Sequence, residues 1–395
     1  MVDSVLIVGA SVAGVGALSE LRRCGFSGRI ALVDGQPHLP YDRPPLSKAV
    51  LKDEMEWAAL QFHDRDHYNR INVDLHLGSA AVALIPDDRT VVLDSGERMA
   101  ADHIIITTGA RARPFPADRC TGHVHLLRDI EDANGLRSRL RRGKRLVVVG
   151  GGFIGAEVAS SASQLGLDVV VIEAAALPLE RILGGEIAAR VARLHTQAGV
   201  ALISGVAVEH IEYANDERTA VILSDGRRLE ADVVVAGLGS SPNVEWIANS
   251  GLKLSNGVIC DETGQTDLPG IFAAGDVAAW LDPLTGFHHR HEHWTAAREQ
   301  ARIVAQTIAG DVTSVWRDFV PYFWSDLYGV RLQMLGSADS ASDVRIVHED
   351  HGKRAFVAEY HRAGELVGVV GCNAGARTMR YASRLVRNNA SANCI

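Results

Sequence analysis

Short runs of apolar residues, separated by glycines and polar turns, are the dominant pattern along this chain. The runs at residues 5–8 and 146–149 each pass directly into a glycine-rich turn. Four consecutive apolar residues before such a turn are typical of a strand that is buried on both faces of a parallel sheet, with a helix starting after the turn. The pattern therefore predicts two units of strand, tight turn and helix.

The same order of elements continues in both halves of the chain. A second apolar run ends in a carboxylate in each half, at Asp34 and at Glu173. Farther on, Asp-Ser-Gly at 94–96 and Ser-Asp-Gly at 224–226 are turn sequences, and each precedes another buried run. We therefore predict an α/β fold in which each half is a Rossmann-like parallel sheet with a hairpin insert.

Composition limits the class of protein. With 395 residues, the chain is long enough for about two to three domains. No apolar run approaches the length of a membrane span, and the first residues lead straight into a strand, so we expect a cytoplasmic protein without a signal peptide or a membrane partner. A net charge of −8 disfavours nucleic-acid binding, and the five cysteines lie far apart in the sequence.

The glycine turns have the spacing of dinucleotide fingerprints. Gly9, Ser11 and Gly14 form the first, and Gly150, Gly152 and Gly155 form the second. Such a turn lets the backbone approach a pyrophosphate at a helix N-terminus, and a carboxylate at the next strand end accepts hydrogen bonds from a ribose diol and repels a 2′-phosphate. An ordinary tight turn is the alternative for one match, but two matches with their acids favour two unphosphorylated dinucleotides. Ser11 in place of the middle glycine leaves less room at the first phosphate.

A further motif joins these sites to a flavin. An apolar strand at 271–274 ends in Gly275 and Asp276, and we expect a helix to start there. The segment resembles the second FAD motif of flavoprotein reductases with two dinucleotide-binding domains. That resemblance implies that Asp276 binds the ribityl chain and that Gly275 lets the backbone pass close. The alternative is that Asp276 only caps the next helix.

The segment Arg-Pro-Pro-Leu-Ser-Lys, residues 43–48, narrows the family. It resembles the FAD-dependent NADH:ferredoxin reductases of bacterial oxygenase systems. The resemblance implies that Lys48 lies beside the reactive edge of the flavin, paired with Glu157 from the second nucleotide helix. The alternative for Lys48 is a solvated surface lysine.

The resemblance covers nearly the whole chain. On the FAD side it implies contacts from Gly9, Ser11, Ala13, Gly14, Asp34, Arg43, Lys48, Val82, Arg128, Gly275, Asp276, Glu292 and Trp294. On the NAD side it implies contacts from Gly150, Gly152, Ile154, Gly155, Glu173, Arg181 and Gly239. Trp324, in a segment that resembles the start of the family's C-terminal domain, either faces the partner protein or packs in the core.

Four histidines crowd into residues 288–293 and suggest a metal site. Adjacent residues on one segment cannot all point at one ion without a sharp bend, and no cysteine accompanies them. We therefore expect no metal. The following residues, 296–301, read as a helix with a small face that packs close to the cofactor.

The expected domains follow from these motifs. Residues 1–112 and 245–318 would form the FAD domain, residues 113–244 the NAD domain and residues 319–395 a C-terminal α+β domain, in a fold like that of glutathione reductase. The last domain should contain strands near 331–335, 355–360 and 367–370. It should end in a helix that carries Arg377, Arg380, Arg384 and Arg387.

The expected reaction depends on a missing residue type. Disulfide reductases and peroxidases of this fold use cysteines, and the loop at residues 44–47 has none. Electrons from NADH must then leave the flavin for an external acceptor. The preferred acceptor is a [2Fe-2S] ferredoxin that serves a cytochrome P450 or a ring-hydroxylating dioxygenase. An NADH oxidase or NADH:quinone reductase without a protein partner is the alternative, and a redox-sensing flavoprotein without enzyme activity is less favoured.

Overall fold

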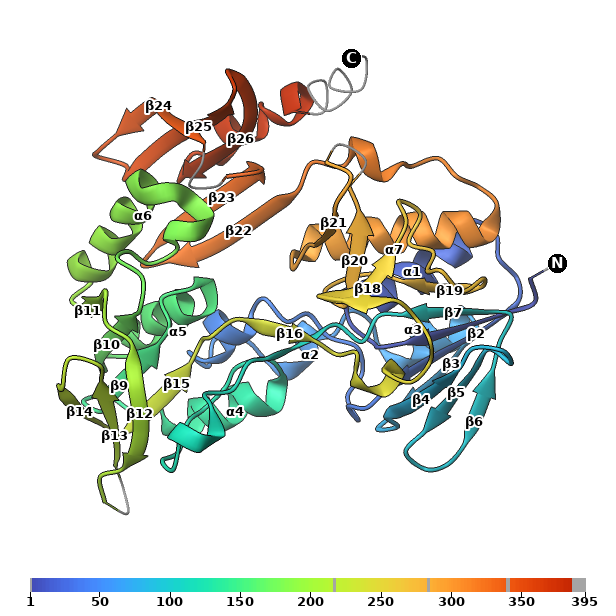
Figure 1. Ribbon diagram of the computed structural model, residues 1–395, viewed down its shortest axis with the longest axis horizontal. Coiled ribbons are helices and arrows are strands. Elements are labelled where there is room, and N and C mark those ends of the chain that lie inside the picture. Colours follow the sequence, from blue (N-terminus) through green and yellow to red (C-terminus); the bar gives the residue numbers. More distant parts are fainter. Residues whose placement is uncertain (1, 216–217, 283–284, 339–341, 386–395) are drawn as a thin grey trace.

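The computed structural model describes residues 2–215, 218–282, 285–338 and 342–385. Two parallel sheets lie on opposite sides of the molecule, and an antiparallel C-terminal sheet lies above the second of them (Figure 1). In the part of the chain that is described, no helix has the length and apolar character needed to cross a membrane.

The first parallel sheet has the strand order β19-β7-β1-β2-β3. Its strands are β1 (Ser4–Val8), β2 (Arg29–Asp34), β3 (Val73–Leu77), β7 (His103–Ile106) and β19 (Ile271–Ala273). The helices of this half are α1 (Val12–Arg23), α2 (Trp57–Leu60), α3 (Arg65–Arg70) and α7 (Trp294–Ala309), with a π-helical turn η1 (Leu46–Val50) and the short turns η3 (Glu245–Ile247) and η4 (Trp316–Asp318). The predicted strand–turn–helix unit is therefore present, because the apolar run of β1 is buried on both faces of the sheet.

Helix α7 packs against α1, side by side in Figure 1. Small residues allow this close contact: a methyl group on Gly16 would lie 3.3 Å from the Cβ of Ala301. The predicted helix is thus present, and at this contact its small residues pack against α1. It ends at Gly310, whose positive φ of 72° suits a helix C-terminus.

The second parallel sheet has the order β11-β10-β9-β15. Its strands are β9 (Arg145–Val149), β10 (Asp168–Glu173), β11 (Ala201–Ser204) and β15 (Val233–Ala236), and its helices are α4 (Ile130–Arg139), α5 (Phe153–Gln164) and α6 (Glu180–Gln197), preceded by the turn η2 (Ala117–Arg119). The connection from β9 through α5 to β10 repeats that from β1 through α1 to β2. Both helices end before a glycine with positive φ, Gly25 and Gly166.

Each half also carries the predicted hairpin insert. The first is the sheet β4 (Ala81–Ile85), β5 (Thr90–Leu93) and β6 (Arg98–Ala100), and the second is β12 (Val208–Tyr213), β13 (Thr219–Leu223) and β14 (Arg228–Ala231). The turns at 94–96 and 224–226 join the last two strands of each insert.

The chain passes between the two parallel sheets through an antiparallel pair, β8 (Ala110–Ala112) with β16 (Ser240–Pro242). The expected boundaries at 112–113 and 244–245 fall at or just after these strands. The third expected boundary, at 318–319, follows η4 directly.

One predicted element is wrong. No helix starts after Gly275 and Asp276; the chain continues as strand β20 (Ala278–Leu281). It lies between β18 (Gly257–Cys260) and β21 (His288–Arg290), in a sheet that β17 (Leu254–Ser255) completes. Val277 and residues 278–280 are all buried, and the strand hydrogen-bonds with β18 on one side and β21 on the other, which supplies partners for backbone groups that water cannot reach.

The C-terminal sheet has the order β22-β23-β26-β25-β24. Its strands are β22 (Tyr322–Leu327), β23 (Val330–Gly336), β24 (Asp343–Asp350), β25 (Ala355–Arg362) and β26 (Glu365–Cys372), followed by α8 (Gly375–Met379). The three predicted strands correspond to β23, β25 and β26. Arg377, Arg380 and Arg384 lie on or just after α8, and Arg387 lies outside the described residues.

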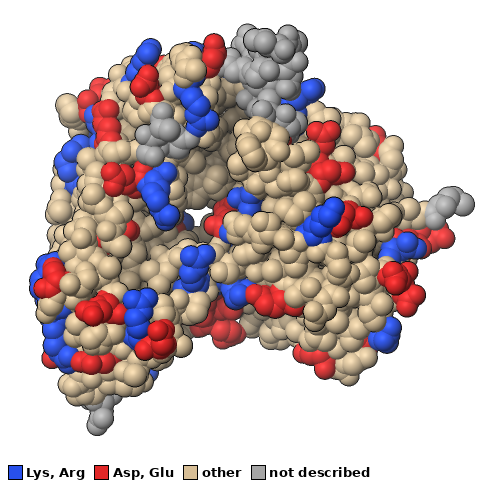
Figure 2. Space-filling view, viewed as in Figure 1, with Lys and Arg blue, Asp and Glu red and all other residues tan. Residues whose placement is uncertain are grey.

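Strand β22 packs the C-terminal sheet against the rest of the molecule. It contacts both α5 and α7. In the space-filling view, the surface is hollowed between the C-terminal lobe and the lobe of α7, with charges of both signs around it (Figure 2). β22 therefore bridges the two halves of the chain through α5 and α7.

Candidate active site

Only glycine fits the ends of the two fingerprint turns. A Cβ on Gly9 would lie 2.2 Å from the carbonyl oxygen of Thr107, and one on Gly14 would lie 2.0 Å from that of Gly9. In the second turn, the corresponding distances are 2.5 Å at Gly150 and 2.1 Å at Gly155, again to carbonyl oxygens. The backbones of both turns are therefore packed as a nucleotide-binding turn requires.

Ser11 fits the first turn without strain. Its φ of −119° and ψ of −159° are extended values that any residue adopts, and it is the N-cap of α1. Gly152 holds the same place before α5, with a φ of −68°. The serine side chain therefore changes only the space left for a phosphate.

The two strand-end carboxylates are bound to their turns. Asp34 accepts hydrogen bonds from the backbone N–H of Ala10 at 2.6 Å and of Gln36 at 2.7 Å. Glu173 accepts from Gly151 and from Ala175, both at 2.8 Å. A carboxylate has about four lone-pair positions, so each acid can still accept from ribose hydroxyls.

Arg128 and Asp276 form an ion pair of 2.7 Å across the two sheets. Arg43 donates to the carbonyl oxygen of Arg128 at 2.7 Å, and Arg290 donates to that of Asp276 at 3.1 Å. The expected flavin anchors Arg43, Arg128 and Asp276 therefore lie together. Because β20 rather than a helix follows Asp276, helix capping does not explain its position.

Several buried polar atoms lack a hydrogen-bond partner around this ion pair. Within the described residues, they are Arg128 Nε, Arg290 Nε, His293 Nδ1 and Gln300 Nε2. The other end of Gln300 accepts from the N–H of Gly275 at 2.8 Å. Unpaired buried donors are costly unless a ligand or water satisfies them. A phosphate- and hydroxyl-rich group such as FAD fits this set.

Lys48 and Glu157 meet in the interior. The Lys48 ammonium lies 2.7 Å from Glu157 Oε2, and the side chain of Glu157 is only 4% exposed. Lys48 lies within η1 in the first half, and Glu157 lies one turn into α5. The pair predicted from the resemblance is therefore formed, and the surface alternative for Lys48 is wrong.

Aromatic side chains line the same region. The indole N–H of Trp294 donates to Asp42 at 2.8 Å, and the ring lies 6.3 Å from that of Trp324. On the other face of β22, Phe323 lies 4.3 Å from Phe153 of the second fingerprint turn and 5.3 Å from His293. Burial raises the pKa of the Asp42 carboxyl.

The remaining expected contacts are more dispersed. Ala13 faces Gly275, since a Cβ there would lie 3.1 Å from that of Ala13. Glu292 pairs with Arg290 and accepts from Ser240. The other predicted residues lie at or near the surface or in a turn: Val82, Ile154, Arg181 and Gly239.

The histidine segment has no metal-binding arrangement among the described residues. His288 and His289 are exposed on β21, whereas His291 and His293 point into the protein. Burial lowers the pKa of His291 to about 4 and also lowers that of His293.

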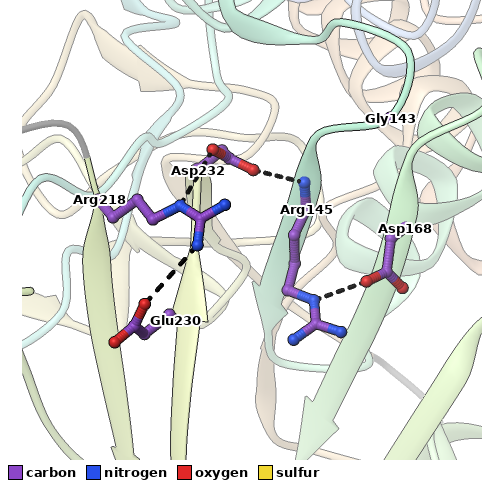
Figure 3. A pocket seen from close by; sticks show the side chains of 6 residues that line it. All are labelled: Gly143, Arg145, Asp168, Arg218, Glu230 and Asp232. Carbon is purple, nitrogen blue, oxygen red and sulfur yellow. Dashed lines mark hydrogen bonds and ion pairs between the residues drawn. The ribbon is translucent and has the colours of Figure 1, made fainter.

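A separate charged pocket lies at the amino-terminal ends of β9 and β10 (Figure 3). There Arg145 pairs with Asp168 at 2.6 Å, and Arg218 lies 3.5 Å from Asp232. Nucleotides bind at the carboxyl ends of parallel strands, which is the opposite end of this sheet. The pocket is therefore a surface ion-pair network, outside the candidate active site.

Two residues of the site were not identified from the sequence. Ser47 and Ser325 both donate to the Glu157 carboxylate, at 2.5 Å and 2.6 Å. For Ser325, the sequence offered one signal: side chains alternate along a strand, so Ser325 lies on the face opposite Trp324.

Comparison with known proteins is consistent with this geometry. Residues 3–301 match the model of the pyridine nucleotide-disulphide oxidoreductase family, and residues 322–394 match that of the reductase C-terminal domain. The ferredoxin reductase component of chlorobenzene dioxygenase from Cupriavidus sp. (strain PS12) is 38% identical, over 99% of this chain and 94% of that protein. Putidaredoxin reductase of Pseudomonas putida is 37% identical, over 85% and 81%.

The structural match is equally broad. The reductase in a covalent putidaredoxin reductase–putidaredoxin complex superimposes with a TM-score of 0.92 at 33% identity, covering 98% of this chain and 93% of that one. The predicted fold class is confirmed: two Rossmann-like units and a C-terminal domain.

Proposed function

The chain belongs to the pyridine nucleotide-disulphide oxidoreductase family, and we propose that it is an FAD-dependent NADH:ferredoxin reductase. The acceptor is a [2Fe-2S] ferredoxin that serves a cytochrome P450 or a ring-hydroxylating dioxygenase. The observation that carries the proposal is the ion pair of Lys48 with the buried Glu157 carboxylate, with Ser47 rather than a cysteine beside it.

Bound FAD would take a hydride from NADH and release its electrons singly. Residues 1–112 and 245–318 hold the FAD, residues 113–244 hold the NADH and residues 319–395 form the third domain. The FAD contacts are Gly9, Ser11, Ala13, Gly14, Asp34, Arg43, Val82, Arg128, Gly275, Asp276, Glu292 and Trp294. The NADH contacts are Gly150, Gly152, Ile154, Gly155, Glu173, Arg181 and Gly239.

Lys48 supplies a fixed positive charge where negative charge arrives with the hydride. Partial burial of the ammonium is costly on its own, and the adjacent carboxylate of Glu157 offsets that cost. Lys48 also donates to the carbonyl oxygen of Pro44 at 3.0 Å, which fixes the direction of its side chain. The pair is therefore oriented before any ligand binds.

Electrons leave toward an external acceptor because, in the described part of the chain, no cysteine lies beside this pair. The free cysteines of the described residues are Cys24, Cys120, Cys260 and Cys372. Burial raises the pKa of the Cys260 and Cys372 thiols, the latter to about 11, which leaves them unreactive. Trp324 of β22, whose ring lies 6.3 Å from that of Trp294 on α7, is the proposed contact with the ferredoxin. The cytoplasm, where NADH is available, is the proposed compartment.

The test separates the three acceptors. The enzyme is reduced with NADH in anaerobic stopped-flow and then mixed with a [2Fe-2S] ferredoxin, a quinone or aerated buffer. Reoxidation by the cognate ferredoxin should be at least about tenfold faster than by the other two. If oxygen or quinone is as fast as every candidate ferredoxin, the protein is an NADH oxidase or quinone reductase instead.

A further inference from the structure

Three parts of the chain meet on the carboxylate of Glu157. Its Oε2 accepts from Ser47 Oγ at 2.5 Å and lies 2.7 Å from the Lys48 ammonium, and its Oε1 accepts from Ser325 Oγ at 2.6 Å. Ser47 and Lys48 come from η1, Glu157 from α5 and Ser325 from the C-terminal strand β22. Both oxygens are thus bonded by partners from outside the helix that carries them.

All of these groups except the lysine are fully enclosed. Ser325 is 0% exposed, and Ser47 and Glu157 are each 3% exposed. A buried carboxylate that loses a donor is left with an oxygen that water cannot reach, and the charged form is then disfavoured. Ser325 is the only partner of Oε1 among the described residues.

The alternation of side chains along β22 relates the Ser325–Glu157 contact to the opposite face of the strand. Ser325 and Phe323 point toward α5, while Tyr322 and Trp324 stack on each other on the opposite face. One strand therefore places an aromatic pair on its outer face and the Glu157 donor on its inner face. Among the described residues, the Ser325 hydroxyl is the group of the C-terminal sheet that hydrogen-bonds to the Glu157 carboxylate.

We propose that Ser325 is a positioning residue for hydride transfer, whose hydroxyl holds the carboxylate of Glu157 turned toward Lys48. This rests on the proposed function, in which Lys48 and Glu157 serve the reaction of NADH with FAD. Ser47 supports the same carboxylate from the other side. The C-terminal domain thereby contributes to the reductive half of the reaction as well as to contact with the acceptor.

The experiment compares Ser325→Ala with a matched control, Ser160→Ala. Ser160 lies one turn beyond Glu157 on α5, is 4% exposed and accepts from the N–H of Tyr328 at 2.8 Å. Its loss removes a buried hydrogen bond between α5 and the turn that follows β22, without touching Glu157. Ser47→Ala is the second test variant, which decides the question if Ser325→Ala fails to retain FAD.

Two quantities are measured between pH 5 and pH 9. The first is the rate constant of flavin reduction by NADH without any acceptor, which does not depend on the ferredoxin assignment. Ser325→Ala should lower it about tenfold at the acid end and much less at the alkaline end, because an unsupported carboxylate takes up a proton more easily. The second is the flavin midpoint potential from a dye-linked titration, whose dependence on pH should differ from that of wild type in Ser325→Ala and match it in Ser160→Ala.

An unchanged pH dependence in Ser325→Ala would overturn the proposal, and so would an equal change in Ser160→Ala. Failure of the proposed function looks different: wild-type flavin would then be reduced by NADH normally yet pass no electrons to a ferredoxin.

Discussion

Asp34 and Glu173 make the same two hydrogen bonds in the two halves of the chain. Each accepts from the second residue of its glycine turn and from the residue two positions after itself, at 2.6–2.8 Å. The acids thus fix the two turns against the sheets before a nucleotide binds. The repeat extends to the strand order around them, which supports one ribose site in each half.

Glu173 should select NADH over NADPH. A carboxylate accepts from the ribose hydroxyls and repels a 2′-phosphate, so NADH should be favoured by at least about tenfold in kcat/KM. Glu173→Arg should narrow or reverse this preference, because a phosphate would then meet a cation. Steady-state rates with both nucleotides give the measurement.

The control for this prediction is Glu173→Gln, which keeps the size of the side chain and an oxygen for the turn. It should bind both nucleotides with a smaller preference than wild type. A preference for NADH that persists in Glu173→Arg would move the selecting residue elsewhere.

Asp276 should be required for retention of non-covalent FAD. Its removal leaves Arg128 without its carboxylate and removes an acceptor from a region that already holds unpaired buried donors. Asp276→Ala should therefore be purified with little flavin, whereas acid precipitation of wild type should release all of its flavin into the supernatant. Flavin absorbance per protein provides the measurement.

Asp261→Ala is a matched control for this variant. Asp261 lies in the same half and accepts hydrogen bonds from the backbone N–H groups of Thr263 and Gln265 in a turn. It should lose some stability and keep its flavin. Flavin that stays in the acid pellet of wild type, or full flavin content in Asp276→Ala, would contradict the assignment.

The parts of the fold that the sequence predicts are those with local signals. The strands around Gly9 and Gly150 are apolar runs that end in a turn only glycine can make, so one short segment determines them. The segment after Asp276 has no such signal, since a short apolar run fits a helix or a strand equally well. Only its neighbours β18 and β21, distant in the sequence, make it a strand.

The candidate site likewise contains residues that a local signal predicts and residues that it does not. The Lys48–Glu157 pair joins residues that are far apart, and only the family resemblance brought them together. The contact of Ser325 with Glu157 spans an even longer separation and depends on which face of β22 turns toward α5. No local pattern encodes that choice, because alternation predicts two faces without stating what each one meets.

The stability of the protein should fall in acid through His195. This side chain is fully buried between α6 and the C-terminal sheet, where it lies 2.7 Å from the Tyr328 hydroxyl. Burial lowers its pKa from 6.5 to about 4, so the unfolded chain binds a proton more tightly than the folded one. Stability is therefore fully present above about pH 6.5 and is lost as the pH falls toward 4.

His195→Gln should remove this dependence. The difference in unfolding free energy between wild type and the variant should shrink by roughly 2 kcal/mol between pH 7.5 and pH 5. Urea unfolding with saturating FAD measures it, and His351→Gln is the control because that side chain is 90% exposed. If the difference in unfolding free energy between wild type and His195→Gln stays constant with pH, His195 is not protonated on unfolding.

Arginines of the C-terminal domain should speed the reaction with ferredoxin. Arg377, Arg380 and Arg384 line a cavity of about 270 Å³ together with Tyr381. Arg384 pairs with Glu359 at 3.6 Å, while Arg377 and Arg380 have no ion-pair partner within the described part of the chain. Ferredoxins of this kind are usually acidic, so unpaired arginines attract them even though the protein carries a net charge of −8.

The double variant Arg377→Ser with Arg380→Ser should slow ferredoxin reduction several-fold at low salt, and its rate should depend less on salt, because screening then has less attraction to remove. Reduction of its flavin by NADH should match wild type. The control is Arg65→Ser with Arg70→Ser, which makes the same change of charge on α3. The measurement is stopped-flow reduction of ferredoxin at several salt concentrations. Equal slowing in both double variants would show that the arginines after β26 are an ordinary solvated surface and do not bind the ferredoxin.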